Sequence, residues 1–344
     1  MPVLDMNNPD EVKEYETFIS TSPYGHMLQS LRWAQVKNNW DPHYVYLRNN
    51  AGNISAAMSV LAIKNDGEHA FLYAPRGPVC DIYDTDTVRE LISLMGGGEN
   101  SYVAKQQAFV LRMDPDVIYD QQLIDTYASI NGMNVRSRDI GDEHAFSNPR
   151  NHMILPFHGR SIDDIIATYP KKFRYQIRRT YKDGLHTRMF TVKDALFSQA
   201  LDRFYDLTQQ MAQRKGISYR PHNYFVRLCH AFDDVRLYET YDDDDEVLSS
   251  GIVVHYNKKA FYIYAATSDN KRHLQPSVQM IIEAMRHAVD AGMDHFDFGG
   301  VYTFDASDGL YLYKSKYCGP DGRQEYIGEL DMVYNTQLYQ DFIN

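Results

Sequence analysis

The chain has 344 residues, of which 44% are hydrophobic and 13% aromatic, so it is long enough for two domains with cores of their own, and disorder is excluded as its main state. No run approaches the ~18–20 apolar residues that span a bilayer, and the acidic start lacks the order of a signal peptide, so we expect a cytoplasmic protein. The net charge of −11 argues against a protein that coats nucleic acid, and the widely spaced Cys80, Cys229 and Cys318 offer neither a disulfide framework nor a zinc site.

The first half of the chain begins with helix-type patterns and then changes to strand-type patterns. Helices are predicted at Pro9–Ser20 and Met27–Asn38, the second one after a Ser-Pro-Tyr-Gly turn. Runs of apolar and β-branched residues separated by Asn/Gly turns then predict three strands, which a helix and a buried strand follow. These five elements are Val45–Arg48, Ile54–Ala62, Ala70–Ala74, Asp84–Met95 and Ala108–Arg112.

The second half repeats this plan. The segment VYLRNNAGNISAAMSVLAI matches RLYETYDDDDEVLSSGIVVHY, and AFLYAP matches AFYIYAA, although chance similarity between two β-meanders is the alternative. Each copy has the order helix, antiparallel meander, helix, strand, so we predict an α/β fold with mixed sheets and two tandem N-acetyltransferase (GNAT)-like domains. The second copy comprises Ser198–Lys215, Val235–Tyr238, Val247–Tyr256, Ala260–Ala265, Ser277–Ala291 and His295–Phe298.

The turn that grips the pyrophosphate of an acyl-CoA in such a domain is missing from both copies. That turn is rich in glycine, because its free N–H groups must approach the phosphates at a helix N-terminus. The corresponding segment of the second copy, 269–277, contains no glycine, and the first copy offers only Pro75-Arg76-Gly77-Pro78, whose prolines remove donors. The sequence therefore indicates another acyl donor.

Eleven short motifs follow one another along essentially the whole chain. They are YG (24–25), WAQVKNNW (33–40), YAPRGP (73–78), LRMDP (111–115), YPKKFR (169–174), RKGI (214–217), YRP (219–221), YIYA (262–265), FGG (298–300), LYLYK (310–314) and EYIGE (325–329). In this order they resemble the FemABX family of peptidoglycan bridge-forming aminoacyltransferases. The resemblance implies transfer of an amino acid (Ala, Ser or Gly) from aminoacyl-tRNA to the side-chain amine of residue 3 of a peptidoglycan precursor, without a cofactor.

The resemblance also implies a domain arrangement. We expect residues 1–150 plus 318–344 to form a first domain that binds the acceptor muropeptide, and residues 151–317 to form a second domain on the aminoacyl-tRNA side, with a cleft between them. No stretch shows the sustained heptads of the coiled-coil arm of larger relatives. The armless form resembles enzymes that act on UDP-MurNAc-pentapeptide, with lipid II as the alternative acceptor; we expect a monomer without stable membrane insertion.

The implied reaction is aminolysis of an ester, which needs positioning and a cation or donor at the oxyanion but no protein nucleophile. Lys314 matches the family lysine at the reacting ester, where it would stabilise the oxyanion or the tRNA terminus; the alternative is a solvated surface lysine. Tyr313 would stack on the terminal adenine. Asp114, at the end of a strand, would hold and orient the acceptor ammonium, and helix capping is its alternative role.

Five further residues match family positions for the acceptor. Lys37 and Arg220 would bind the diphosphate, since arginine grips phosphate oxygens bidentately. Tyr224 and Tyr264 would contact the muramyl peptide, with core packing as their alternative role, and Ser218 takes the place of a hydroxyl residue.

A basic segment stands out from the acidic chain. Between Tyr169 and Lys193 there are eight basic residues and one acidic residue. Lys171, Arg174, Arg178 and Lys182 recur there at helical spacing, which predicts contacts with tRNA phosphates.

Other classes of function stay open at this point. The motifs H-E-x-x-H, C-x-x-C and G-x-S-x-G are absent from the sequence, which removes metalloprotease, zinc-site and hydrolase interpretations. A CoA-dependent GNAT N-acyltransferase would share the fold, and a non-catalytic RNA-binding protein would share the basic segment.

Overall fold

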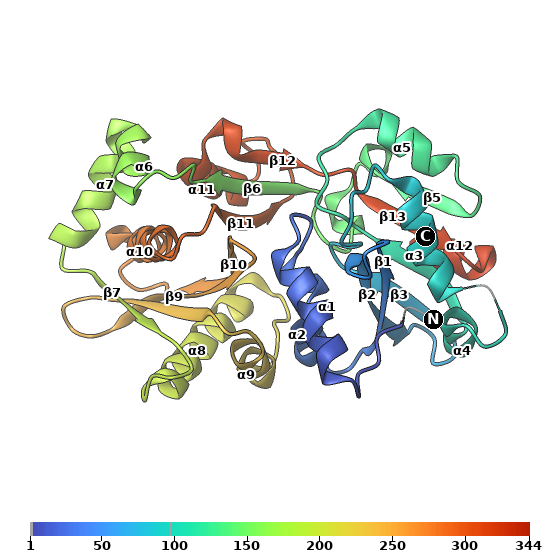
Figure 1. Ribbon diagram of the computed structural model, residues 1–344. Coiled ribbons are helices and arrows are strands. Elements are labelled where there is room, and N and C mark those ends of the chain that lie inside the picture. The colour runs from blue at the N-terminus through green and yellow to red at the C-terminus, as the bar shows by residue number, and fades with distance from the viewer. Residues whose placement is uncertain (1–2, 97) are drawn as a thin grey trace. The chain divides into compact units, whose positions relative to one another are not determined.

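The computed structural model describes residues 3–96 and 98–344. The chain divides into two units, Met1–Asn151 with Gln324–Asn344, and His152–Arg323 (Figure 1). Residues 318–323 belong to the second unit, whereas the sequence analysis assigned them to the first. Each unit contains one mixed sheet with helices on it, which confirms the expected fold class.

The first unit is built on a six-stranded sheet in the order β1-β2-β3-β4-β13-β5. Strands β1, β2 and β3 form an antiparallel meander, and β4 pairs parallel with β3. Strand β13, near the C-terminus, pairs antiparallel with both β4 and β5, so the end of the chain completes this sheet. The strands are β1 (Asp41–Arg48), β2 (Ile54–Lys64), β3 (Ala70–Ala74), β4 (Ala108–Met113), β5 (Met133–Arg136) and β13 (Glu329–Val333).

Side-chain caps set where the helices of this unit begin. Asn8 and Asp84 each accept a hydrogen bond from the main-chain N–H three residues further on, at the starts of α1 and α3. The helices are α1 (Pro9–Thr21), α2 (Leu31–Val36), α3 (Thr85–Met95), α4 (Tyr102–Gln106), α5 (Gln121–Ala128) and α12 (Thr336–Ile343), with the short 3₁₀ turns η1 (Met27–Gln29), η2 (Arg138–Ile140) and η3 (Glu143–Ala145).

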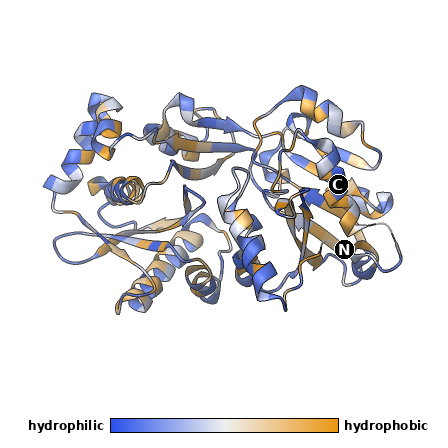
Figure 2. Cartoon of the chain, in the orientation of Figure 1, coloured by the Kyte–Doolittle hydropathy of each residue, from blue (hydrophilic) through white to orange (hydrophobic). Residues whose placement is uncertain are grey.

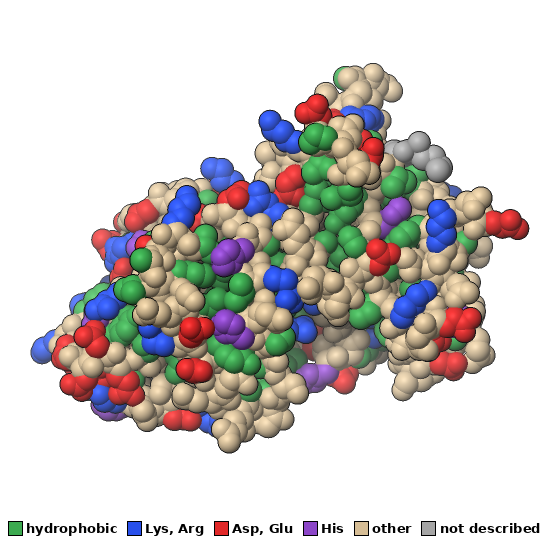
Figure 3. All heavy atoms as spheres, turned by 90° about the horizontal axis from the view of Figure 1, so that it is seen from below, with side chains coloured by type: hydrophobic (Ala, Val, Ile, Leu, Met, Phe, Trp, Pro, Cys, Tyr) green, Lys and Arg blue, Asp and Glu red, His purple; other side chains and the backbone are tan. Residues whose placement is uncertain are grey.

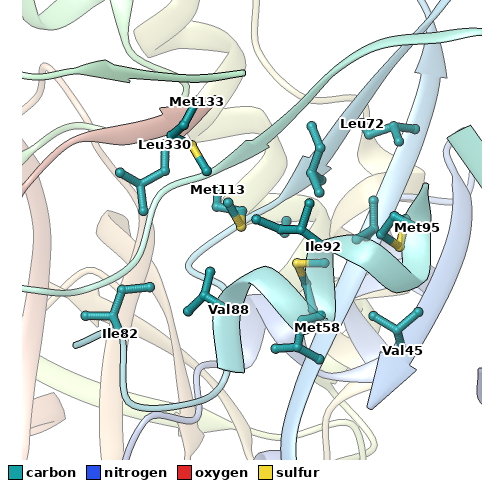
Figure 4. Packing of buried hydrophobic residues seen from close by; sticks show 14 of the residues in the cluster. Val45, Met58, Leu72, Ile82, Val88, Ile92, Met95, Met113, Met133 and Leu330 are labelled. Atoms are coloured by element: carbon teal, nitrogen blue, oxygen red, sulfur yellow. The ribbon is translucent and has the colours of Figure 1, made fainter. Parts of the chain in front are cut away.

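The core of the first unit lies between α3 and the sheet (Figure 4). Val88, Ile92 and Met95 follow one another at helical spacing and point toward Met58 of β2 and Met113 of β4. All five side chains are buried. The helix is therefore held on the sheet by the apolar face that these regularly spaced residues form.

The helix expected over Met27–Asn38 is divided in the structure. Ser30 has extended backbone angles, φ −66° and ψ 146°, and its hydroxyl accepts the N–H of Arg32, so a new helix, α2, starts there. That hydroxyl also donates to Glu16 at 2.6 Å, which fixes the break. As a result Lys37 lies at the C-cap of α2, just beyond the helix.

The sheet of the second unit has seven strands in the order β12-β6-β11-β10-β9-β8-β7, of which Asn151 in β6 and Gln324 and Glu325 in β12 are counted with the first unit. Strands β8, β9 and β10 form an antiparallel meander, and β11 pairs parallel with β10, as β4 does with β3 in the first unit. The internal repeat in the sequence therefore corresponds to a shared strand order. The strands are β6 (Asn151–Pro156), β7 (His186–Phe190), β8 (Val235–Tyr241), β9 (Val247–Tyr256), β10 (Lys259–Thr267), β11 (His295–Val301) and β12 (Arg323–Glu325).

Helix α10 provides much of the second core. Its buried residues Met280, Ile281 and Met285 cluster with Phe296 and Phe298 of β11. Figure 2 shows hydrophobic and hydrophilic residues alternating along the helices, as expected for helices with one face on a sheet. The helices are α6 (Ile162–Thr168), α7 (Lys171–Lys182), α8 (Phe197–Lys215), α9 (His222–Ala231), α10 (Pro276–Asp290) and α11 (Gly309–Cys318), with the 3₁₀ turns η4 (Arg272–Leu274) and η5 (Pro320–Gly322).

Two expectations concern long helices. Among the described residues the longest helix is α8, with 19 residues, so no coiled-coil arm is present in that part of the chain. None of the helices in residues 3–96 and 98–344 combines the length and the apolarity needed to cross a membrane.

Candidate active site

Lys314 is held by the main chain of the neighbouring strand. It lies in α11, which begins where the Asp308 carboxylate accepts the N–H of Leu310 at 2.7 Å. Its Nζ donates a 2.6 Å hydrogen bond to the carbonyl oxygen of Gly300. Burial lowers the pKa of the Lys314 ammonium to about 8, against the opposing attraction of Asp297. Lys314 is thus a partly buried, anchored cation instead of a freely solvated one.

The carbonyl that anchors Lys314 belongs to a glycine turn at the end of β11. Gly299 has a φ of +75°, a conformation that residues with a side chain rarely adopt. Its N–H donates to Oδ1 of Asp297 at 2.7 Å. The next residue, Gly300, then presents its carbonyl oxygen to Lys314.

Tyr313 packs against the core of the second unit. Its ring is half-buried in the cluster around Phe298 and Tyr317, and the ring centroids of Tyr313 and Tyr317 are 5.7 Å apart. Its hydroxyl is buried and lies near the hydroxyls of Ser277 and Tyr317. Stacking of Tyr313 on a nucleotide base stays a prediction. Only the exposed part of the ring is available for such a contact.

Three of the predicted acceptor residues form one cluster in the second unit. The guanidinium of Arg220 is exposed and lies 5.5 Å from the ring centroid of Tyr224. The hydroxyls of Tyr224 and Tyr264 are 3.0 Å apart. Phe225 packs edge-on against both of these tyrosines, so the three rings form a packed aromatic cluster that Arg220 contacts through Tyr224. Ser218 is exposed in the preceding loop.

Lys37 is framed by the only two tryptophans of the sequence. In the first unit its Nζ lies 5.7 Å from the ring centroid of Trp33 and 5.9 Å from that of Trp40. The side chain is half-buried. Contact with two aromatic faces restrains a flexible lysine.

Asp114 lies just beyond β4 and is only 2% exposed. Its carboxylate accepts hydrogen bonds from the hydroxyl of Tyr73 at 2.6 Å, the N–H of Arg76 at 2.6 Å and the amide of Asn148 at 2.8 Å. Burial raises its pKa even though these donors and the Arg76 charge oppose the shift.

This geometry bears on both roles that the sequence suggested for Asp114. No helix begins at this position, so helix capping is wrong as an explanation of the residue. Two of the donors, Tyr73 and Arg76, belong to the motif YAPRGP, whereas Asn148 lies outside every motif and had no signal in the sequence. An orienting role toward an ammonium stays a prediction, and the ammonium would have to share the carboxylate with these donors.

Helix α7 presents its basic residues to solvent. Phe173 and Ile177 are buried, whereas Lys171, Arg178 and Lys182 are exposed and form no ion pair with any residue of 3–96 and 98–344. Arg174 is half-buried and donates to the carbonyl of Ala167 at 3.3 Å, so it is less available than the other three. The face in Figure 3 mixes basic and acidic side chains, but α7 contains no acidic residue.

No metal site is found in the described residues, which contain no suitable group of three or more His, Cys, Asp or Glu side chains. The reaction implied above requires no such site, because its needs are a positioned amine and a stabilised oxyanion. The three cysteines are free and buried, and burial raises the pKa of the Cys80 thiol to about 12, which makes it a poor nucleophile.

Comparison with known families gives two matches. A model described as the FemAB family matches residues 11–238, and a model of an acetyltransferase (GNAT) domain matches residues 171–315. Among curated proteins, the UDP-N-acetylmuramoylpentapeptide-lysine N(6)-alanyltransferase of Weissella viridescens is 35% identical to this chain. The alignment covers 100% of this chain and 99% of that protein. The lipid II:glycine glycyltransferase of Staphylococcus haemolyticus is 23% identical, with 95% of this chain and 93% of that protein covered.

Solved structures support the fold. A crystal structure of FemX superposes with a TM-score of 0.82 at 20% identity, covering 100% of both chains. A tandem GNAT protein from the clavulanic acid biosynthesis pathway superposes with a TM-score of 0.55 at 10% identity, covering 95% of this chain and 96% of the other.

Proposed function

The chain belongs to the FemAB family, and on this basis we propose that it transfers an amino acid from aminoacyl-tRNA to the side-chain amine of residue 3 of a peptidoglycan precursor, initiating the interpeptide bridge. The observation that carries the proposal is the 35% identity with the Weissella viridescens alanyltransferase over the full length of both proteins. That relative acts on a UDP-linked pentapeptide at lysine, so UDP-MurNAc-pentapeptide is our first acceptor. Because aminoacyl-tRNA is cytoplasmic, the reaction is assigned to the cytoplasm.

The chemistry is the exchange of an ester for an amide. The neutral acceptor amine attacks the aminoacyl carbonyl carbon, the C–O bond to the terminal ribose breaks, and the proton lost by the amine goes to the ribose oxygen that leaves. Negative charge develops on the carbonyl oxygen, where a fixed donor lowers the barrier. Lys314 suits this role because its ammonium has three N–H donors and Gly300 occupies one of them.

Recognition of the acceptor requires cations for the diphosphate. Arg220 offers an exposed planar fork that rests on Tyr224, and in the first unit Lys37 is restrained between two indole rings. Tyr224 and Tyr264 present hydroxyls beside Arg220 and would contact the muramyl peptide, as would Ser218. Helix α7 would bind tRNA phosphates through Lys171, Arg178 and Lys182, with Arg174 in a smaller part.

A CoA-dependent N-acyltransferase is the second candidate, because the GNAT-domain model matches the second unit. The loop before α10 argues against a pyrophosphate there. Pro276 occupies the first helical position and donates no hydrogen bond, and Gln275 takes up the left-handed conformation usual for glycine. The ammonium of Lys271 is already paired with the carboxylates of Asp242, Asp244 and Glu246.

The deciding experiment offers all donors to the purified protein. UDP-MurNAc-pentapeptide with lysine at position 3 is incubated separately with alanyl-, seryl- and glycyl-tRNA and with acetyl-CoA, and the products are identified by mass spectrometry. We expect one aminoacyl residue on the lysine side chain; lipid II as acceptor is the parallel assay. An acetylated product would support the CoA-dependent enzyme instead, and tRNA binding without any product would indicate an RNA-binding protein.

A further inference from the structure

A buried carboxylate that the reaction above does not use lies directly behind the Lys314 anchor. Asp297, on β11, is 7% exposed. It accepts the N–H of Gly299 at 2.7 Å and so closes the glycine turn of its own strand. The carbonyl oxygen of Gly300, the next residue of that turn, is the 2.6 Å acceptor of the Lys314 ammonium. The position of Lys314 Nζ therefore depends on a turn that Asp297 holds.

Asp297 also carries charge. Burial alone would raise its pKa, but His152 on β6, the N–H of Gly299 and His295 on its own strand outweigh burial and hold the pKa below its usual range. Nδ1 of His152 lies 3.5 Å from Oδ1 of Asp297. At neutral pH the buried group is therefore a carboxylate.

Three ionisable groups lie on the elements around the Lys314 ammonium. They are Asp297 on β11, Cys318 on α11 itself and Asp308 at the start of α11, and the two carboxylates favour the charged ammonium at neutral pH. Asp297 has the largest effect of the three. The carboxylate of Asp308 also accepts the N–H of Leu310, which caps α11, and the N–H of Tyr302 in the preceding loop. Cys318 is a thiol whose pKa burial raises, so it carries no charge at neutral pH.

We propose that Asp297 is the positioning residue for Lys314: it fixes the Gly299–Gly300 turn whose carbonyl oxygen anchors the ammonium, and it places a buried carboxylate on the strand that Lys314 contacts. A lysine side chain has four rotatable bonds, so an oxyanion donor of this type needs an anchor to be in place before the reaction. The inference rests on the proposed function only for the part that Lys314 plays at the ester. The link between Asp297 and Lys314 is a property of the second unit by itself.

The substitution Asp297→Asn separates the two contributions. Asparagine has the same shape, and its amide oxygen accepts the Gly299 N–H, so the turn persists while the charge is lost. We expect the protonation midpoint of Lys314 to fall by about one pH unit, since neighbouring opposite charges shift pKa values by about 1–3 units. The matched control is Asp305→Asn, an exposed carboxylate in the loop before α11 that accepts the N–H of Ser307.

The first measurement does not depend on activity. Lys314 in the wild-type protein, in Asp297→Asn and in Asp305→Asn is labelled competitively with an amine reagent over a range of pH, and the extent of labelling is read by mass spectrometry. A lower midpoint in Asp297→Asn alone is the expected result. Equal midpoints in all three proteins would overturn the proposal, whether or not the protein transfers amino acids.

The second measurement is the pH profile of the single-turnover transfer rate. For a midpoint that falls by one unit from about 8, the charged fraction of Lys314 in Asp297→Asn is about fivefold lower at pH 8 and less than twofold lower at pH 6.5. We therefore expect a rate defect that recovers at low pH, which a general loss of structure would not show. A defect that is equal at both pH values would contradict the role, and absence of transfer by the wild type would instead refute the proposed function.

Discussion

The hydroxyl of Tyr73 donates a 2.6 Å hydrogen bond to the carboxylate of Asp114, joining the ends of the parallel strands β3 and β4. Asn148 donates to both residues, at 2.6 Å to the Tyr73 hydroxyl and at 2.8 Å to Asp114. This network ties three separate segments of the first unit together. A carboxylate in such surroundings has a structural role whether or not it also meets a substrate.

Replacement of Asp114 by asparagine is expected to affect stability more than chemistry. The NH₂ group of asparagine would point at hydrogen-bond donors that the carboxylate of Asp114 now accepts from. A buried polar group left without a partner costs about 1–3 kcal/mol. We expect a decrease of about 2 kcal/mol in the free energy of unfolding, measured by denaturant titration.

The same variant tests whether Asp114 is a general base that accepts the proton of the acceptor amine. Removal of a general base lowers the rate by about 10²–10⁴-fold. The single-turnover rate of Asp114→Asn, measured at a temperature where the variant is folded, is expected to stay within about tenfold of wild type. A loss of about 10³-fold in a folded variant would make Asp114 the base.

The cations assigned to the acceptor should act on binding. In Lys37→Met and Arg220→Met the charge is lost while Lys314 and its anchor remain, so we expect the KM for UDP-MurNAc-pentapeptide to rise about 10-fold or more with little change in kcat. Steady-state kinetics with aminoacyl-tRNA saturating give both constants. Lys215→Met, an exposed lysine at the end of α8, is the matched control. Unchanged KM in both site variants would remove these residues from acceptor binding.

Helix α7 should determine the salt dependence of tRNA binding. Each lost phosphate contact removes about one released counterion, so Arg178→Gln and Lys182→Gln are each expected to reduce the slope of log K against log salt concentration by about 1. Arg174→Gln should have a smaller effect, because its side chain already donates to Ala167. Filter binding at several salt concentrations measures this. The control is Arg188→Gln on β7, where Arg188 pairs with Asp245; this variant should leave the slope unchanged. Equal slopes in all four variants and the wild type would show that α7 does not bind tRNA phosphates.

Much of the fold could be predicted because its central elements have simple local signals. The buried runs at Ile54–Lys64 and Val247–Tyr256 are long and flanked by turn residues, and Thr85–Met95 combines a cap with a regular apolar face. Strand β13 was missed because its five residues, Glu329–Val333, pair with strands about 200 positions earlier in the chain. Its charged Glu329 and Asp331 form buried ion pairs with Arg136 and Arg112, which no local pattern shows.

The candidate site divides in the same way. Lys314, Arg220 and Tyr264 belong to short motifs that can be compared with a family, so they could be chosen from the sequence. Asp297 stands two residues before Gly299 in the same strand, and no sequence pattern connects it with a lysine in the following helix. The connection needs the glycine turn and the position of α11 beside β11, which are tertiary features.

The central claim is that Lys314 stabilises the oxyanion of the aminoacyl ester. The most direct measurement is the single-turnover transfer rate of Lys314→Ala with tRNA and acceptor both saturating, with Lys316→Ala, an exposed lysine on the same helix, as the control. Loss of one such donor costs about 2.7–4 kcal/mol, so we predict a decrease of about 10²–10³-fold in Lys314→Ala and a change of less than about twofold in the control. A Lys314→Ala protein that transfers the amino acid at the wild-type rate would contradict the account.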